Sequence, residues 1–335
     1  MALTKITNDL LDLGSDTGAL GLPKGTTAQR PSNPVEGTLR HNSEIDETKL
    51  ETFDGTDWRK INKVIPTYSV DYLVIAGGGG GSRYGGGGAG GLRTSYGATS
   101  GGGSSSESAL TLTTSTSYTI TVGAAGAGGN RSAGSKGGDS VFSTITSNGG
   151  GHGQQTYNVS LIDGGSGGGG DADSSKPGGS GTSGQGYNGG PAGGVYLPDY
   201  RGTGGGGAAQ AGQAQDGNAG DGGNGLAVSI SGLSVTYAGG GGGASYQYAP
   251  GTGGSGGGGN GSYWKNGASP EVPNGTTGAI NTGSGGGASM DGGSGVVILR
   301  MPTANYSNIT TGNPTVAIDG TDTILTYTSS GTYTA

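Results

Sequence analysis

The chain changes character within Val70-Asp-Tyr-Leu-Val-Ile-Ala-Gly-Gly-Gly-Gly-Gly81, where an apolar run passes directly into a run of glycines. Further glycine runs follow as far as Gly295, and a second apolar run, Val296–Leu299, closes them. Short runs rich in valine and isoleucine predict buried strands. A disordered linker has no reason to carry such strands at both ends. The sequence therefore predicts an ordered glycine-rich body bracketed by two β-strands.

Glycine supplies 85 of the 335 residues, against roughly 7% in average proteins. Holding one glycine in regular structure costs roughly 0.5–1 kcal/mol more than holding alanine. Over all 85 glycines the upper bound is on the order of 40–85 kcal/mol, whereas the net stability of a domain is only about 5–15 kcal/mol. The chain is therefore either disordered or folded in an architecture that requires glycine. This composition argues against a helical bundle or an α/β enzyme.

Polyproline-II-type helices supply such an architecture. They have about three residues per turn and no internal hydrogen bonds, so in a bundle their N–H and C=O groups must pair with adjacent helices. Only glycine leaves room for close packing on every side. We therefore predict an irregular, all-β-like protein in which residues 66–300 form a stack of antiparallel polyglycine-II helices. Loops that carry the bulky residues join these helices.

Residues 1–65 have an ordinary composition and are predicted to form two parts. Residues 1–20 are predicted to be an attachment or oligomerisation segment. The spacing of their apolar residues is that of a short coiled-coil seam or of a short amphipathic turn; these residues are Leu3, Ile6, Leu10 and Leu13. Residues 21–65 contain short alternating runs and a turn signal. They are predicted to form a small β-meander with Phe53 and Trp58 as apolar anchors.

Charge and composition exclude several function classes. Lys and Arg total 16 and Asp and Glu total 23, which gives a net charge of −7, so no basic patch predicts a nucleic-acid partner. There is no cysteine for a disulfide or a thiolate metal site. The apolar stretches are too short to cross a membrane, and the N-terminus lacks the apolar core of a secretory signal. We therefore expect neither membrane insertion nor a secretory route.

Catalytic chemistry is also not predicted. Two G-x-S-x-G matches are expected by chance at this glycine density, and His41 and His152 have no acid–base partners in the pattern. Two acidic pairs, Asp171 with Asp173 and Asp319 with Asp322, could contribute carboxylates to a calcium ion, but solvated loop acids are the preferred interpretation. We predict no catalytic residue, no metal ligand and no cofactor.

Aromatic side chains gather in the insertions between glycine runs. Tyrosine and tryptophan combine a large contact area with a polar handle, which suits sugar faces or protein epitopes. Arg201 and Lys265 could reach phosphate or carboxylate groups of a surface glycan. The alternative is that the aromatic side chains pack on the glycine helices and cover apolar surface. The predicted receptor-binding residues are Tyr157, Tyr196, Tyr200, Arg201, Tyr246, Tyr248, Tyr263, Trp264 and Lys265.

Several motifs in order along the chain resemble the glycine-rich domain of bacteriophage tail-fibre and adhesin proteins. They are Val70–Gly81, Gly85–Arg93, Tyr118–Gly123, Gly137–Phe142, Tyr237–Gly243 and Gly292–Arg300. A short module recurrent in phage tail proteins is similar to the N-terminal region at Leu22–Pro31, Pro34, Gly37, Arg40, Asn42 and Trp58. The resemblance implies packed polyglycine-II helices with variable loops at a tip that binds the host surface.

The resemblance further implies a virion tail-fibre protein that is made in the host cytoplasm. It would attach to other tail proteins through residues 1–65, form a homotrimer, and bind a host cell-surface glycan or an outer-membrane protein. The alternative is a purely structural, self-assembling fibre or virion decoration subunit, whose aromatic loops would be buried between subunits. Residues 301–335 depart from the pattern, because Thr323–Tyr333 resembles a segment that more often precedes the strand at Val70. A separate cap, an exchanged strand and a link to another protein stay open for this segment.

Overall fold

The computed structural model of the chain describes residues 22–45, 49–61, 65–130, 132–154, 162–171, 177–191, 200–263 and 274–335. The chain divides into two compact units, Met1–Ile65 and Pro66–Ala335. Regular structure in the described ranges consists of β-strands and short 3-10 turns, without an α-helix. The all-β prediction is therefore confirmed. The same ranges contain no helix with the length and apolarity to cross a membrane. The predicted attachment segment, residues 1–20, lies outside them.

The first unit is a four-stranded sheet in the order β1-β2-β3-β4. β1 runs parallel to β2, and the other neighbours pair antiparallel. A 3-10 turn, η2 (Thr27–Gln29), follows β1. The strands are β1 (Lys24–Gly25), β2 (Leu39–Asn42), β3 (Leu50–Phe53) and β4 (Trp58–Lys60).

The centre of this first unit is polar. Its fully buried residues, among those described, are Arg40, Asn42 and Glu51. The Glu51 carboxylate accepts hydrogen bonds from Arg30 at 2.6 Å, from Arg40 at 2.8 Å and from the Asn42 amide at 3.1 Å. The expected anchor Trp58 is only partly buried, with the Arg30 and Arg40 guanidiniums 5.9 and 5.8 Å from its ring centroid. The expected anchors Phe53 and Trp58 do pack on each other, with ring centroids 5.7 Å apart, and the ion pairs of Glu51 with Arg30 and Arg40 add a buried polar network to this small sheet.

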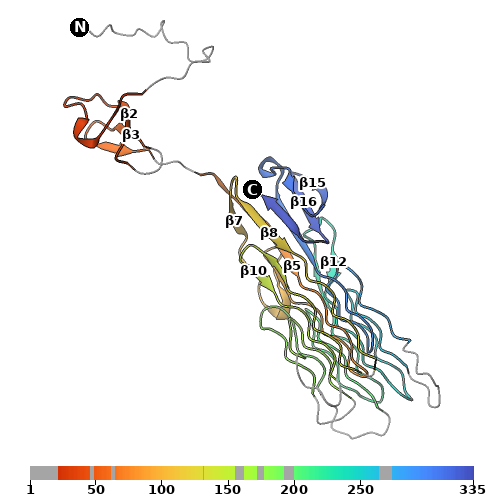
Figure 1. Ribbon diagram of the computed structural model, residues 1–335. Coiled ribbons are helices and arrows are strands. Elements are labelled where there is room, and N and C mark those ends of the chain that lie inside the picture. The colour runs from red at the N-terminus through yellow and green to blue at the C-terminus, as the bar shows by residue number, and fades with distance from the viewer. Residues whose placement is uncertain are drawn as a thin grey trace. The chain divides into compact units, whose positions relative to one another are not determined.

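The second unit contains two open sheets and a hairpin (Figure 1). The larger sheet has the order β15-β16-β13-β5-β6, with β7 also paired to β5, and the smaller has the order β10-β9-β8-β17-β14. The larger sheet consists of β5 (Thr67–Ile75), β6 (Leu92–Thr94), β7 (Leu110–Thr113), β13 (Val296–Pro302), β15 (Thr315–Asp319) and β16 (Asp322–Tyr327). The smaller sheet and the hairpin consist of β8 (Ser117–Thr121), β9 (Ser140–Phe142), β10 (Ile145–Ser147), β14 (Ile309–Thr310), β17 (Gly331–Thr334), β11 (Leu226–Val228) and β12 (Val235–Tyr237). Two 3-10 turns complete the unit, η3 (Gly101–Gly103) and η4 (Thr303–Asn305).

The central strands β5 and β13 of the larger sheet are buried on both faces, which explains their uninterrupted apolar runs. Tyr72 and Val74 of β5 pack into the core shared with the smaller sheet. The alternate residues Leu73 and Ile75 pack against the β11–β12 hairpin and the first turns of the glycine segments. The two predicted bracketing strands, β5 and β13, are direct antiparallel neighbours. The glycine-rich body therefore begins and ends at the same place in the core.

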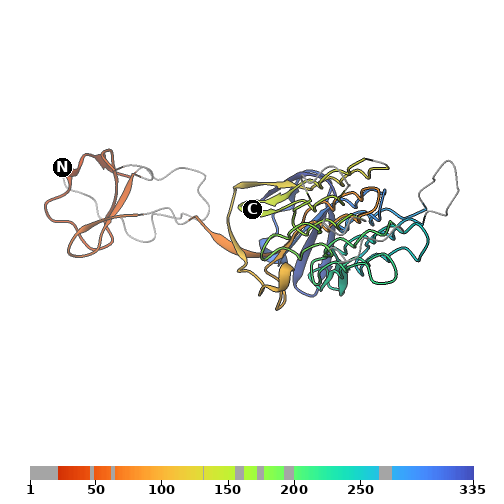
Figure 2. The ribbon, with the colours of Figure 1, turned by 90° about the horizontal axis from the view of Figure 1, so that it is seen from below.

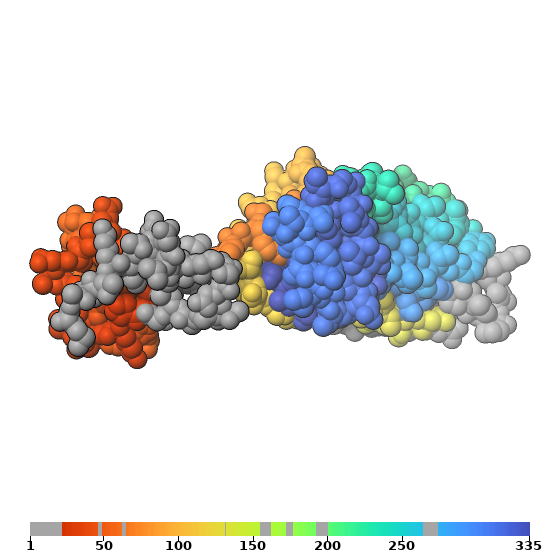
Figure 3. Space-filling view, turned by 90° about the horizontal axis from the view of Figure 1, so that it is seen from above, coloured from red at the N-terminus to blue at the C-terminus, as the bar shows by residue number. Residues whose placement is uncertain are grey.

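The C-terminal segment completes both sheets of its own chain. β16 pairs with β13 in the larger sheet, and β17 pairs with β8 in the smaller one. Residues near the C-terminus, in blue, cover much of one face of this unit (Figure 3). Within the chain, residues 301–335 are thus an integral part of the second unit. Their strands β16 and β17 pair with strands of the same chain.

The glycine segments lie outside the strands and run side by side (Figure 2). In Gly77–Ser82, N–H groups three residues apart donate to the same neighbouring segment. The N–H groups of residues 77 and 80 donate to segment 135–138, and those of residues 78 and 81 donate to segment 290–293. The N–H groups of residues 79 and 82 donate to segment 85–88. The carbonyl groups of this segment accept from three other segments, at 126–129, 150–153 and 286. The segment is therefore surrounded by hydrogen-bonded backbone on all sides.

This packing explains why the positions must be glycine. A Cβ built on Gly78 or Gly241 would fall on a carbonyl oxygen of an adjacent segment, well inside the 3.0 Å that real Cβ atoms keep. Successive segments run antiparallel, as Gly77–Ser82 and Gly85–Gly88 do. Parallel neighbours also occur, because residues 242 and 245 donate to residues 259 and 262 respectively. The expected purely antiparallel stack is corrected in that respect.

Candidate functional site

The glycine segments run back and forth and reverse in turns, several of which lie at the end remote from the sheets (Figure 1). Ser82 and Tyr84 lie in one such turn, between the segments that join β5 to β6. The Tyr84 carbonyl accepts from the Ala244 N–H at 2.8 Å, and the Ser82 carbonyl accepts from the Ser289 N–H at 2.8 Å. We call the described residues of these turns, 82–85, 200–203, 244–250 and 288–290, the loop end.

Three tyrosines from different turns form one cluster at the loop end. Tyr84 is 5% exposed and packs on Ala244 and Ala288. The Tyr200 ring stacks on it, with centroids 5.7 Å apart and an interplanar angle of 13°. The Tyr246 ring meets Tyr200 edge-on at 6.1 Å and 79°. Tyr84, Tyr200 and Tyr246 are called the tyrosine cluster below.

Tyr200 combines exposure with backbone strain. It is 50% exposed, although it belongs to an aromatic cluster. Its φ is 47°, in the left-handed region, which bulky residues rarely adopt. Such a conformation costs on the order of 1–3 kcal/mol and is often found at ligand-binding sites. The fold therefore holds this ring outward at an energetic cost.

Arg201 is turned inward instead of toward solvent. It is 5% exposed, and its guanidinium carbon lies 4.6 Å from the ring centroid of Tyr248. Its Nε is buried without a hydrogen-bond partner in the described structure. Tyr248 itself is 43% exposed. In this structure Arg201 therefore does not extend toward a phosphate or carboxylate outside the loop end. Its guanidinium makes a cation–π contact with the Tyr248 ring instead.

A polar cavity of about 410 Å³ opens beside Tyr248. Ala249 and Pro250, which directly follow Tyr248, line one wall. The Asp221 carboxylate accepts from the Thr252 N–H at 2.6 Å. The opposite wall carries amide and carboxylate groups from Gln213, Asp216, Asn218 and Asp221.

The remaining predicted site residues divide into two groups. Tyr263 is partly buried, donates its N–H to Asn274 Oδ1 at 2.7 Å and forms a bridge with Ser245 of the loop end. The other predicted residues lie outside the described ranges: Tyr157, Tyr196, Trp264 and Lys265. Receptor binding by any of the nine stays a prediction.

Sequence reasoning missed Tyr84 and Arg83. Tyr84 is the buried base of the tyrosine cluster, and the Arg83 guanidinium carbon lies 5.0 Å from its ring centroid. The available signal was the interruption Ser82-Arg-Tyr84 between two glycine runs.

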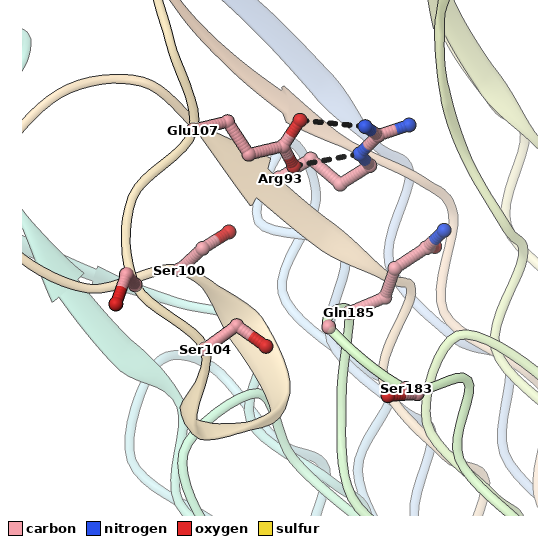
Figure 4. A pocket seen from close by; sticks show the side chains of 8 residues that line it. Arg93, Ser100, Ser104, Glu107, Ser183 and Gln185 are labelled. Atoms are coloured by element: carbon pink, nitrogen blue, oxygen red, sulfur yellow. Dashed lines mark hydrogen bonds and ion pairs between the residues drawn. The ribbon is translucent and has the colours of Figure 1, made fainter.

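A second cavity, of about 250 Å³, lies near the sheets between β6, the loop before β7 and the turn at 183–185 (Figure 4). The Arg93 guanidinium forms a two-pronged ion pair with Glu107, at 2.7 and 2.5 Å. The Tyr72 hydroxyl donates to the same carboxylate at 2.8 Å. Serine hydroxyls and the Gln185 amide complete the lining. Its charged groups satisfy each other, so this cavity presents mainly hydroxyl groups.

Burial and the ion pair set the pKa values of this second cavity. Burial opposes ionisation of Glu107, but hydrogen bonds from Arg93 and Tyr72 outweigh it and lower the pKa of the carboxyl. Burial, together with the hydrogen bond to Glu107, raises the pKa of Tyr72. At neutral pH the carboxylate is therefore ionised and the phenol is neutral. This arrangement ties the loop before β7 to the sheet.

Candidate calcium ligands are accounted for by other contacts. Asp319 and Asp322 form ion pairs with Arg300, at 2.8 and 2.9 Å, while their side chains stay 49% and 29% exposed. Asp171 is buried, and Asp173 lies outside the described ranges. No group of three or more metal-ligating side chains occurs in the part of the chain that the structure describes.

Comparison with known proteins identifies a family. Residues 60–302 match the family described as glycine-rich domain. No curated protein and no solved structure matches the chain. The match covers most of the chain, including both bracketing strands and all the glycine segments between them. The chain therefore belongs to the glycine-rich domain family.

Proposed function

We propose that the glycine segments are packed polyglycine-II helices. The return of hydrogen bonds to the same neighbour at every third residue fits a helix of about three residues per turn. The absence of room for a Cβ toward adjacent segments fits packing of such helices at close range. A bundle cross-linked in this way would be a stiff support for the turns at its end.

We further propose that the protein is a virion tail-fibre protein that attaches to the host-cell surface through the loop end. The observation that carries this proposal is the strained, half-exposed Tyr200 ring stacked on buried Tyr84. Binding residues are often held on turns above a rigid scaffold. The phage assignment rests on the ordered motifs between Val70 and Arg300.

Attachment in this proposal is multivalent and involves no chemical reaction. Residues 1–65 would join the protein to other tail proteins, and the working form would be a homotrimer. Several weak loop-end contacts become strong avidity when copies engage together. Assembly would take place in the host cytoplasm before incorporation into the virion tail.

A structural, self-assembling subunit is the second candidate function, because one edge of the larger sheet is open. β15 is exposed along its whole length, with Val316 48% and Ile318 71% exposed. It pairs only with β16 among the described strands. Unpaired edge strands with apolar side chains are templates for pairing with another chain.

One pair of variants separates the two functions. Labelled protein is added to cells of candidate host strains, and bound protein is measured by flow cytometry. Tyr200→Ala should reduce cell binding at least about tenfold and leave the oligomeric state unchanged. The matched control Ile318→Ala, also an exposed apolar truncation, should leave cell binding unchanged. If Ile318→Ala dissociates the assembly and Tyr200→Ala has no effect on cells, the structural function is correct and attachment through the loop end is wrong.

A further inference from the structure

We propose that the ligand of the loop end is a neutral glycan, with one sugar ring packed against the exposed part of Tyr200. This inference rests on the proposed attachment function and goes beyond it. It chooses between the two receptor classes, glycan and protein, that the sequence leaves open. It also assigns a charge class to the glycan.

The first argument is the shape of the aromatic surface. Tyr84 covers one face of the Tyr200 ring, at 5.7 Å and 13°, and Tyr246 stands edge-on to it. Tyr200 is nevertheless 50% exposed, so part of this aromatic side chain is available to a ligand. Aromatic faces carry partial negative charge, so they attract the polarised C–H groups on one side of a pyranose ring. A prepared aromatic surface suits a sugar better than an irregular protein epitope.

The second argument is the charge beside this surface. Among the described loop-end residues both arginines are already engaged, since Arg201 is 5% exposed with its guanidinium against the Tyr248 ring and Arg83 lies over Tyr84. The cavity bordered by Ala249 and Pro250 carries two carboxylates, Asp216 and Asp221, and no cation among its described lining residues. A negative, partly enclosed surface repels phosphate, sialic acid and uronic acid groups. The site therefore selects against anionic sugars.

The third argument is the hydrogen-bonding capacity of the cavity. Carboxylates accept hydrogen bonds, whereas the amides of Gln213 and Asn218 can both donate and accept. Sugar hydroxyls also do both, so a neutral sugar can satisfy this lining. The volume of about 410 Å³ lies within the usual range of roughly 300–1,000 Å³ for small-ligand sites. The cavity has room for one sugar ring.

The binding experiment uses the full-length protein and defined probes. Immobilised neutral oligosaccharides ending in glucose, galactose, mannose or N-acetylglucosamine are compared with sialylated and uronic-acid counterparts. We expect binding to at least one neutral probe and at least about tenfold weaker binding to its acidic counterpart. Tyr200→Phe should keep the affinity within about threefold, and Tyr200→Ala should reduce it at least about tenfold. Asp216→Asn should narrow the difference between neutral and acidic probes, because it removes one charge but keeps a polar side chain.

Treated cells distinguish this inference from the attachment function. Periodate destroys sugar diols on the cell surface, whereas protease removes surface proteins. Loss of cell binding after periodate only, together with binding to a neutral probe, supports the inference. Loss after protease only would mean that attachment is real but the receptor is a protein, and the glycan inference would be wrong. Binding to no probe below about 10 mM, or equal binding by Tyr200→Ala, would overturn it as well.

Discussion

Replacing Gly241 by valine tests the packing of the glycine-rich body at one defined contact. Gly241 donates its N–H to the Gly87 carbonyl at 2.9 Å and accepts from the Gly205 N–H at 2.8 Å. A Cβ at this position would fall on the carbonyl oxygen of Gly286. That oxygen accepts from the Gly87 N–H at 2.8 Å. The valine side chain can therefore be accommodated only if segments move apart at these three hydrogen bonds.

The expected cost follows from those contacts. Overpacking costs about 1–3 kcal/mol, and three weakened hydrogen bonds at about 1 kcal/mol each add about 3 kcal/mol. The total of about 4–6 kcal/mol is a large part of the roughly 5–15 kcal/mol that stabilises a domain. At about 2–4 °C per kcal/mol for a domain near this size, the melting temperature should fall by about 8–24 °C.

Differential scanning calorimetry of the full-length protein measures this change. The matched control is Gly217→Asn, because Gly217 is exposed, has a φ of +67° and has nothing within 4 Å of a built Cβ. Asparagine tolerates this backbone conformation, so the control should melt within about 2 °C of the parent. If Gly241→Val melts together with the control, the close packing at Gly286 does not exist and the argument for required glycine fails there.

Three further predictions concern other parts of the chain. Glu107→Gln should lower the free energy of unfolding by about 1 kcal/mol at pH 7. The pKa of Glu107 lies below its ordinary 4.5, so its ionised form stabilises the fold above that pH. Urea titrations at pH 3 should therefore show a smaller difference in unfolding free energy between the variant and the parent. Glu51→Gln should destabilise the first unit by about 3 kcal/mol, since Arg40 stays buried without its carboxylate partner. Hydrogen exchange of the β2 and β3 amides should become faster. Unchanged protection of these amides would contradict a structural role for the Arg40–Glu51 ion pair. Tyr200→Asn should leave the melting temperature unchanged or slightly higher, because asparagine relieves the strain at φ 47°; a marked loss of stability would mean that the ring is there for packing.

Some of the fold can be read from local sequence. The runs at Val70 and Val296 predict strands, and the structure places β5 and β13 there. The loop-end aromatics Tyr200, Tyr246 and Tyr248 stand out because they interrupt glycine-rich surroundings. These signals are local, since β-branched residues favour strands and turns carry the bulky side chains.

Other features depend on contacts between distant residues. Arg201 was expected at the surface, but the turn that carries it packs beneath Tyr248, and no pattern within residues 196–201 encodes that ring. Residues 301–335 could not be assigned, because their partners β13 and β8 lie on either side of a long glycine-rich insertion. The polar centre of the first unit likewise appears only when Arg30, Arg40 and Glu51 meet.

By itself, the sequence predicted an irregular, all-β-like protein with a body in which glycine is sterically required. This was possible because the size and β-branching of a side chain influence the local backbone conformation of its own residue. The tertiary structure alone decided which glycine segments are neighbours, as when Gly77–Ser82 contacts segments from residues 85 to 293. Glycine has no side chain that could distinguish one neighbouring segment from another. Which segments become neighbours is therefore fixed by backbone hydrogen bonds and by the strands that anchor each segment. The same neighbour order brings Tyr84, Tyr200 and Tyr246 into one cluster.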